Sequence, residues 1–94
     1  GTDLAELTRE LKRPGAFDDY GAQLVSLEPT RLAGSDALKA TLEAKKSKEI
    51  PALALELWLL PKASRLLIVE CGAPQLLFPM YRPLCLAIVE RLRP

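Results

Sequence analysis

Residues 53–60, LALELWLL, are apolar on nearly every side, whichever secondary structure they adopt. A strand would place leucines on one face, with an alanine, a glutamate, a tryptophan and a leucine on the other. A helix of the same residues would be apolar around most of its circumference, as expected only for a covered helix. The segment therefore needs covering on two sides, and in a chain of 94 residues a second molecule could supply one of them.

Two structures compete for residues 53–71. A hairpin of 53–60 with 66–71, joined by a loop over 61–65, would match two apolar faces but place Glu56 opposite Glu70, an unfavourable like-charge pair. Two short helices are the other solution, with Ser64 as an N-cap and Gly72 just past the end. The chain has 20 leucines and 12 alanines against three valines and three isoleucines, and this composition favours helix.

The first half of the chain carries three helical patterns. Leucines at i, i+3 and i+7 predict a helix over residues 4–11, which ends at the KRPG sequence of residues 12–15. A second apolar stripe of helical spacing runs through residues 17–27. Ser35 fits the N-cap of a third helix, whose lysine-rich end suits the helix dipole.

The C-terminal segment contains three prolines before its last apolar stripe. Pro83 fits the first turn of a helix over residues 84–92, with residues 73–81 leading in as irregular or kinked chain. Leu84, Ile88 and Leu92 repeat at i, i+4 and i+8, which predicts a stripe that faces the core.

These patterns predict a mainly α fold, a small helical domain of about five short helices. The alternative is an α+β fold with a hairpin at 53–60/66–71 packed against helices. In either case residues 1–94 are expected to form a single small domain, excised from a longer protein.

Composition argues against catalysis. The chain contains no histidine, the commonest general base and metal ligand, and no phosphate-binding or nucleophile motif. Its two cysteines, Cys71 and Cys85, are expected to be buried free thiols, with a structural disulfide between them as the alternative. Free thiols point to an intracellular protein. Thirteen basic against twelve acidic residues create no overall field, and no apolar run is long enough to span a membrane. We expect no enzyme activity, cofactor or metal.

Recognition of protein remains the favoured function. Residues 50–94 hold 28 of the 46 apolar residues, and they include aromatic and methionine side chains of the kind enriched at interface centres. We expect a non-catalytic interaction or oligomerisation domain that binds another protein or itself through an apolar face. The candidate partner-binding residues are Leu55, Trp58, Leu59, Phe78, Met80 and Tyr81.

Two alternatives to protein recognition are consistent with other features of the sequence. A nucleic-acid-binding module would use the basic segment of Lys39, Lys45, Lys46 and Lys48, although acids are interspersed and no aromatic is available to stack on bases. A helical groove could instead bind a peptide or a lipid.

Overall fold

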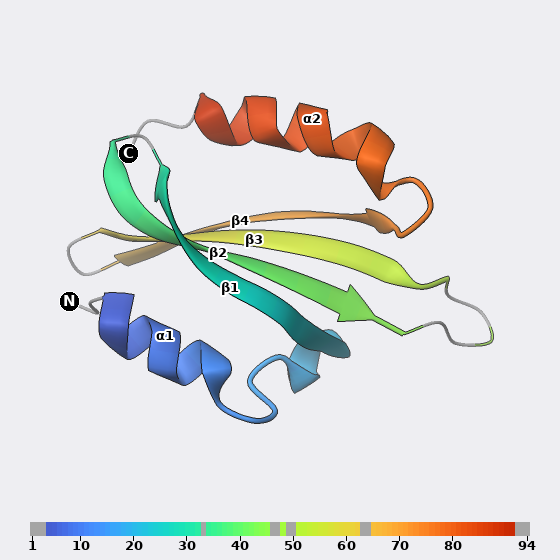
Figure 1. Cartoon of the computed structure of the whole chain (residues 1–94), viewed down its shortest axis with the longest axis horizontal. Helices are drawn as coiled ribbons and strands as arrows, with labels where there is room; N and C mark the ends of the chain where they lie inside the picture. Colours follow the sequence, from blue (N-terminus) through green and yellow to red (C-terminus); the bar gives the residue numbers. More distant parts are fainter. Residues whose placement is uncertain (1–3, 33, 46–47, 49–50, 63–64, 92–94) are drawn as a thin grey trace.

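The computed structural model describes residues 4–32, 34–45, 48, 51–62 and 65–91. A four-stranded sheet lies between two helices, one on each face (Figure 1). The elements in chain order are α1 (Leu4–Lys12), the short 3-10 helix η1 (Asp18–Tyr20), β1 (Ala22–Leu32), β2 (Ser35–Ala44), β3 (Leu53–Lys62), β4 (Arg65–Pro74) and α2 (Phe78–Glu90). The strands follow the order β1-β2-β3-β4 and each pairs antiparallel with the next.

The predicted mainly α fold is wrong. The second and third expected helices correspond to β1 and β2, and both candidate helices of residues 53–71 are strands β3 and β4. Strand β2 shows why, because Leu38, Ala40 and Leu42 are buried and alternate with polar residues that are less buried. Burial of a period-two face outweighs the modest helix propensity of leucine and alanine. Ser35, expected as a helix N-cap, is instead the first residue of β2.

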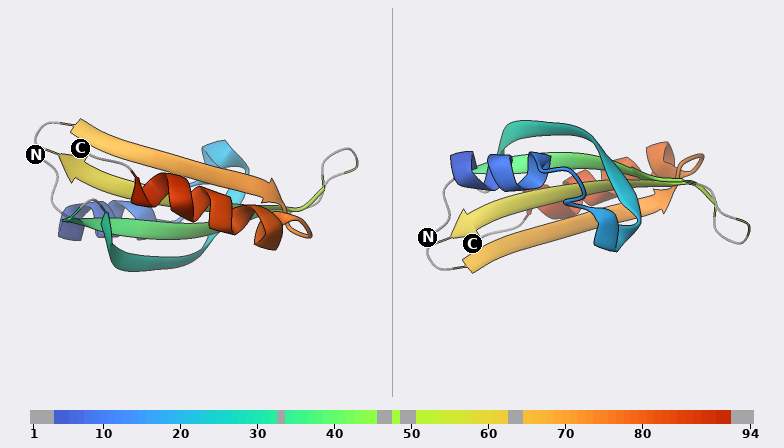
Figure 2. Two further views of the ribbon diagram at one scale, coloured as in Figure 1. Left: turned by 90° about the horizontal axis from the view of Figure 1, so that it is seen from above. Right: turned by 90° about the horizontal axis from the view of Figure 1, so that it is seen from below.

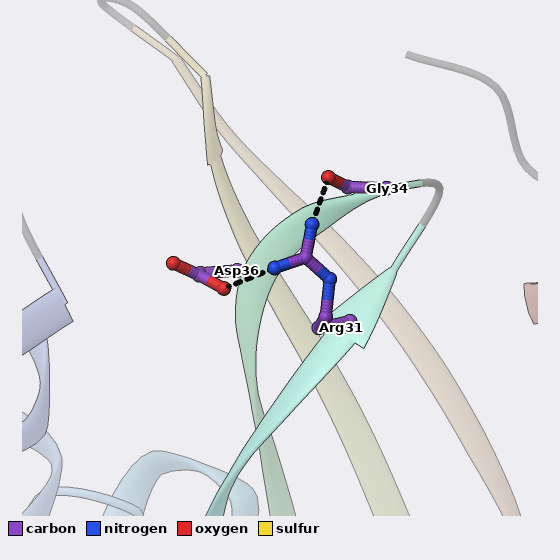
Figure 3. Close-up of polar contacts among 3 residues, drawn as sticks. All are labelled: Arg31, Gly34 and Asp36. Atoms are coloured by element: carbon purple, nitrogen blue, oxygen red, sulfur yellow. Dashed lines mark hydrogen bonds and ion pairs between the residues drawn. The ribbon is translucent and has the colours of Figure 1, made fainter.

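The β1–β2 hairpin closes at Leu32 and Ser35, which are partners in the strand register. Gly34 has a φ of 80°, a left-handed conformation that suits glycine in a tight turn. Arg31 donates hydrogen bonds to the carboxylate of Asp36, at 3.0 Å, and to the carbonyl oxygen of Gly34 (Figure 3). Since Arg31 and Asp36 are both exposed, their ion pair contributes little to stability.

The expected strand pair of residues 53–60 and 66–71 is present, in a register that differs by one residue from the proposed one. Leu57 pairs with Glu70, and Glu56 pairs with Cys71. A shift of one residue moves every side chain of β4 to the opposite face. The observed register separates Glu56 from Glu70 and removes the like-charge pair that counted against a hairpin. Ser64, the other expected N-cap, lies outside the described residues.

The core has two layers, one on each side of the sheet. Helix α1 covers the side on which β2 and β3 present leucines, and Leu7 and Phe17 pack there against Leu42 and Leu57. Helix α2 covers the opposite side, where Val89 packs against Trp58 and Leu60. Views from above and below show the two helices on opposite faces (Figure 2). The chain therefore covers β3 on both sides by itself.

The two helices relate differently to the sequence expectations. Helix α1 is present where it was predicted, and the chain turns after it at Gly15, whose φ is 78°. Helix α2 begins earlier than predicted, at Phe78, with Pro79 in its first turn and Pro83 inside the helix. Packing of α2 on the sheet therefore outweighs the backbone hydrogen bond that Pro83 cannot donate.

Both layers of the core are expected to contribute to stability. Leu42→Ala and Leu60→Ala, one on each face, should each lower the free energy of unfolding by about 2–5 kcal/mol, because both side chains are fully buried. Leu66→Ala is the matched control, since Leu66 on β4 is 41% exposed and its truncation should cost less than about 1 kcal/mol. Urea denaturation at one fixed protein concentration measures all three. An equally small effect at Leu60 would contradict a core on the α2 side.

Candidate functional site

The structure divides the predicted partner-binding residues into two groups. Trp58 and Leu59 are each 3% exposed and Phe78 is 9% exposed, so these three side chains belong to the core. Leu55 is partly buried and packs against the α1-side cluster. Met80 and Tyr81, both on α2, are exposed at 73% and 47%. The surface part of the predicted site therefore lies on α2 alone.

Helix α2 is apolar on its outer side as well as its inner side. Its inner side carries Phe78, Cys85, Leu86 and Val89 toward the sheet. The outer side carries the α2 stripe, a row of five large apolar residues that are 42–73% exposed: Leu77, Met80, Tyr81, Leu84 and Ile88. An ordinary surface helix presents polar residues outward, as α1 does with Glu6, Arg9 and Glu10.

The stripe corrects the expected orientation of this helix. Leu84 and Ile88 were predicted to face the core, and they are 62% and 61% exposed. Leu92 lies outside the described residues. Phe78 and Val89, on the neighbouring stripe of the helix, fill the core positions instead. A helix that is apolar on all sides can face the core through either stripe.

A shallow apolar groove of about 310 Å³ runs between α2 and β4. Its walls are four residues of the α2 stripe, the C-terminal part of β4 and two cysteines; the lining residues are Cys71, Gly72, Ala73, Pro74, Leu77, Tyr81, Leu84, Cys85 and Ile88. The stripe therefore faces the β4 side of the sheet. None of the lining residues is charged, so this groove would accept an apolar side chain or helix face rather than a polar ligand.

An ion pair with a buried carboxylate holds the N-terminal half of α2 on the sheet. Glu56 on β3 is 4% exposed, and its Oε1 lies 3.0 Å from Nε of Arg82. Nζ of Lys39 lies 3.8 Å from the same oxygen and 6.0 Å from the centre of the Trp58 ring. The one charged residue in the middle of α2 thus points inward, opposite to the usual arrangement of a surface helix.

The other carboxylate oxygen of Glu56, Oε2, is buried and has no hydrogen-bond partner among the described residues. Glu56, Lys39 and Arg82 line a cavity of about 390 Å³ under the start of α2, with Phe78 and Leu55 among its apolar walls. The cavity is polar enough to hold water molecules that would satisfy this oxygen.

A disulfide joins Cys71 of β4 to Cys85 of α2. The expectation of free thiols is therefore wrong, and no free cysteine is present in the described parts of the chain. The two residues that seemed separate in the sequence meet because α2 folds back over the strand that precedes it. The intracellular location inferred from free thiols loses this support.

The two edges of the sheet differ in how they are protected. Edge strand β1 contains Pro29, charged residues and an irregularity in register next to Val25, all features that discourage further strand pairing. Edge strand β4 exposes three consecutive apolar residues, Leu66, Leu67 and Ile68, at 39–47%. The less protected edge is therefore β4, the strand whose C-terminal part borders the groove.

The structure does not bring the predicted basic residues together on a helix. Lys39 lies on β2, half-buried beside Glu56. Lys45 and Lys48 are exposed in the connection between β2 and β3, and Lys46 falls outside the described residues. The four lysines were expected on or near one helix that begins at Ser35, and residues 35–44 form strand β2 instead. The ammonium group of Lys39 is already engaged by a carboxylate.

Among the described residues, no group of three or more His, Cys, Asp or Glu side chains is placed to hold a metal ion. Neither described helix has the length and apolarity required to cross a membrane.

Comparison with known proteins adds no assignment. A scan against protein-family models, a search of curated proteins and a search of solved structures each gave no significant match. The α2 stripe and the groove beside it are therefore judged on their own physical chemistry.

Part of this site was readable from the sequence. The residues Leu77, Tyr81, Leu84 and Ile88 are spaced 4-3-4, the pattern of a helix that packs along one seam. The sequence prediction treated the chain through residue 81 as irregular and began the helix at Pro83. It therefore left Leu77 and Tyr81 out of the helical pattern.

The Glu56–Arg82 pair is expected to show energetic coupling. Arg82→Met should lower the free energy of unfolding by about 1–3 kcal/mol, less than for a fully buried pair because Arg82 is half exposed. In a Glu56→Gln background the same change should cost clearly less, since no buried charge is left behind. A double-mutant cycle by urea denaturation measures the difference, and equal costs in both backgrounds would contradict the coupling.

Reduction of the Cys71–Cys85 disulfide should destabilise the fold. A loop closed over a separation of 14 residues predicts a loss of about 3 kcal/mol in the free energy of unfolding. Urea denaturation with and without reductant measures this loss. The Cys71→Ala/Cys85→Ala variant is the control and should not respond to reductant. If reductant released both thiols and left the urea midpoint unchanged, the disulfide would not stabilise the fold.

Proposed function

We propose that this chain is a non-catalytic protein-interaction domain and that the α2 stripe is its binding surface. The observation that carries the proposal is the outward apolar face of α2, where five large side chains are 42–73% exposed. Exposed apolar residues are normal when scattered singly, whereas a continuous row on one helix marks an interaction site.

The α2 stripe is also held in a fixed orientation, as expected for a binding surface. The Glu56–Arg82 pair fixes α2 to β3, and the Cys71–Cys85 disulfide fixes it to β4. A surface that is rigid before it binds loses less conformational entropy on association. The two attachments therefore present the stripe in one orientation.

The alternative functions receive less support from the described residues. Of the lysines proposed for nucleic acid, Lys39 lies on β2 and is committed to Glu56, apart from Lys45 and Lys48 in the connection between β2 and β3. The groove beside α2 has room for an apolar segment of a peptide, which would itself be a form of protein recognition.

Photo-crosslinking in the cells that make the protein tests this proposal. A benzophenone amino acid at position 84 should give a discrete protein adduct, because the side chain there would lie inside an interface. The same group at Val25, 55% exposed on β1, is the matched control and should give none.

A second change in the crosslinking chain makes the test specific. Ile88→Glu should abolish the adduct at position 84 by placing a charge in the stripe, while Val25→Glu should leave it unchanged. No adduct at position 84, or an adduct that Ile88→Glu leaves intact, would contradict the proposed binding surface.

A further inference from the structure

We infer that the partner of the α2 stripe is a second copy of this chain, docked through its own α2 in an antiparallel helix pair around a two-fold axis. The inference rests on the proposed function and names the occupant of its binding surface. Its basis is that the stripe has the spacing of a paired helix and carries no charge that a second copy would repel.

The spacing of the stripe matches an antiparallel pair. Leu77, Tyr81, Leu84 and Ile88 follow the 4-3-4 repeat that keeps one seam of a helix against a partner. An axis centred between positions 82 and 83 places Leu77 opposite Ile88 of the second copy and Tyr81 opposite Leu84. Every residue of the seam then faces a large apolar residue, as an interface around a two-fold axis requires.

Charge does not oppose this arrangement. Arg82 is the only charged residue between positions 71 and 89, and it is turned inward to Glu56. The next charged residues, Glu90 and Arg91, fall at the far ends of the antiparallel pair, near positions 75 and 74 of the other copy. The seam is therefore free of like-charge contacts, in contrast to the acid- and base-rich outer face of α1.

The area is of the right order for a small dimer. The four seam residues are 42–62% exposed, and Met80 at their flank is 73% exposed. Together they offer several hundred Å² of apolar surface, near the lower end of the roughly 600–1,000 Å² per partner of standard interfaces. The groove between α2 and β4 adds room for the side chains of the second copy.

Sedimentation equilibrium of the purified full chain, with its disulfide intact, tests the inference. The wild-type chain should sediment with the mass of two chains. Leu84→Glu should raise the dimer dissociation constant by at least about 30-fold, as for a central interface residue. Val25→Glu, an exposed apolar residue at the opposite edge, should leave the dissociation constant unchanged within about twofold. Far-UV circular dichroism checks that each variant keeps the fold, and Ile88→Glu is a second variant with the same expectation.

A charge pair tests the register. Leu84→Lys alone should dissociate the dimer, and Tyr81→Glu/Leu84→Lys in one chain should restore it, because positions 81 and 84 of the two copies face each other. If association returned only on mixing a Leu84→Lys chain with a Leu84→Glu chain, position 84 would face its own copy and the register would be wrong.

The remaining outcomes separate this inference from the proposed function. A wild-type chain that stays monomeric at about 1 mM overturns self-association. If an adduct at position 84 still formed in cells, the stripe would bind a different protein and the proposed function would stand. A dimer that Leu84→Glu leaves intact would show that another surface, such as edge strand β4, joins the two copies, and would also overturn the inference.

Discussion

Strand β3 is apolar on both faces, and the arrangement of the rest of the chain follows from the need to cover it twice. Leu7 of α1 and the neighbouring Phe17 cover one side, and α2 covers the other. Covering a central strand on both faces requires an element in each layer, and in the described part of the chain α1 and α2 supply them. The chain therefore covers both faces of its most apolar segment without a second molecule.

Because α2 covers one face of β3, the exposed apolar side chains lie on the outer side of α2 instead of on β3. The inner side of α2 must match an apolar sheet that also contains Glu56, so the one charged residue in the middle of the helix, Arg82, points inward. The outer side is left with Leu77, Tyr81, Leu84 and Ile88. A helix of this kind is stable only when something covers its outer side or when strong attachments hold it in place, and here the attachments are the ion pair and the disulfide.

The sequence allowed prediction of helix α1, its end, the pairing of residues 53–60 with 66–71 as an alternative, and two of the exposed apolar side chains of α2, Met80 and Tyr81. It did not distinguish strand from helix in β1 and β2, because leucine and alanine favour helix. The alternation of Leu38, Ala40 and Leu42 with polar residues in β2 was readable in the sequence, and its burial outweighs that propensity. The disulfide and the Glu56–Arg82 pair depend on α2 folding back over β3 and β4. No local pattern predicts such a contact between distant residues.

Hydroxyl-radical footprinting of the wild-type chain over a range of protein concentrations tests the central claim most directly, since it reports which side chains solvent reaches in solution. Tyr81 and Leu84 are 47% and 62% exposed in the single chain, and Val25 is 55% exposed on the opposite edge. The account predicts that Tyr81 and Leu84 become protected as the concentration rises, while Val25 keeps the same reactivity. The account would be contradicted if the reactivity of all three residues stayed constant as the protein concentration rises, with Tyr81 and Leu84 as reactive as their exposure in a single chain implies.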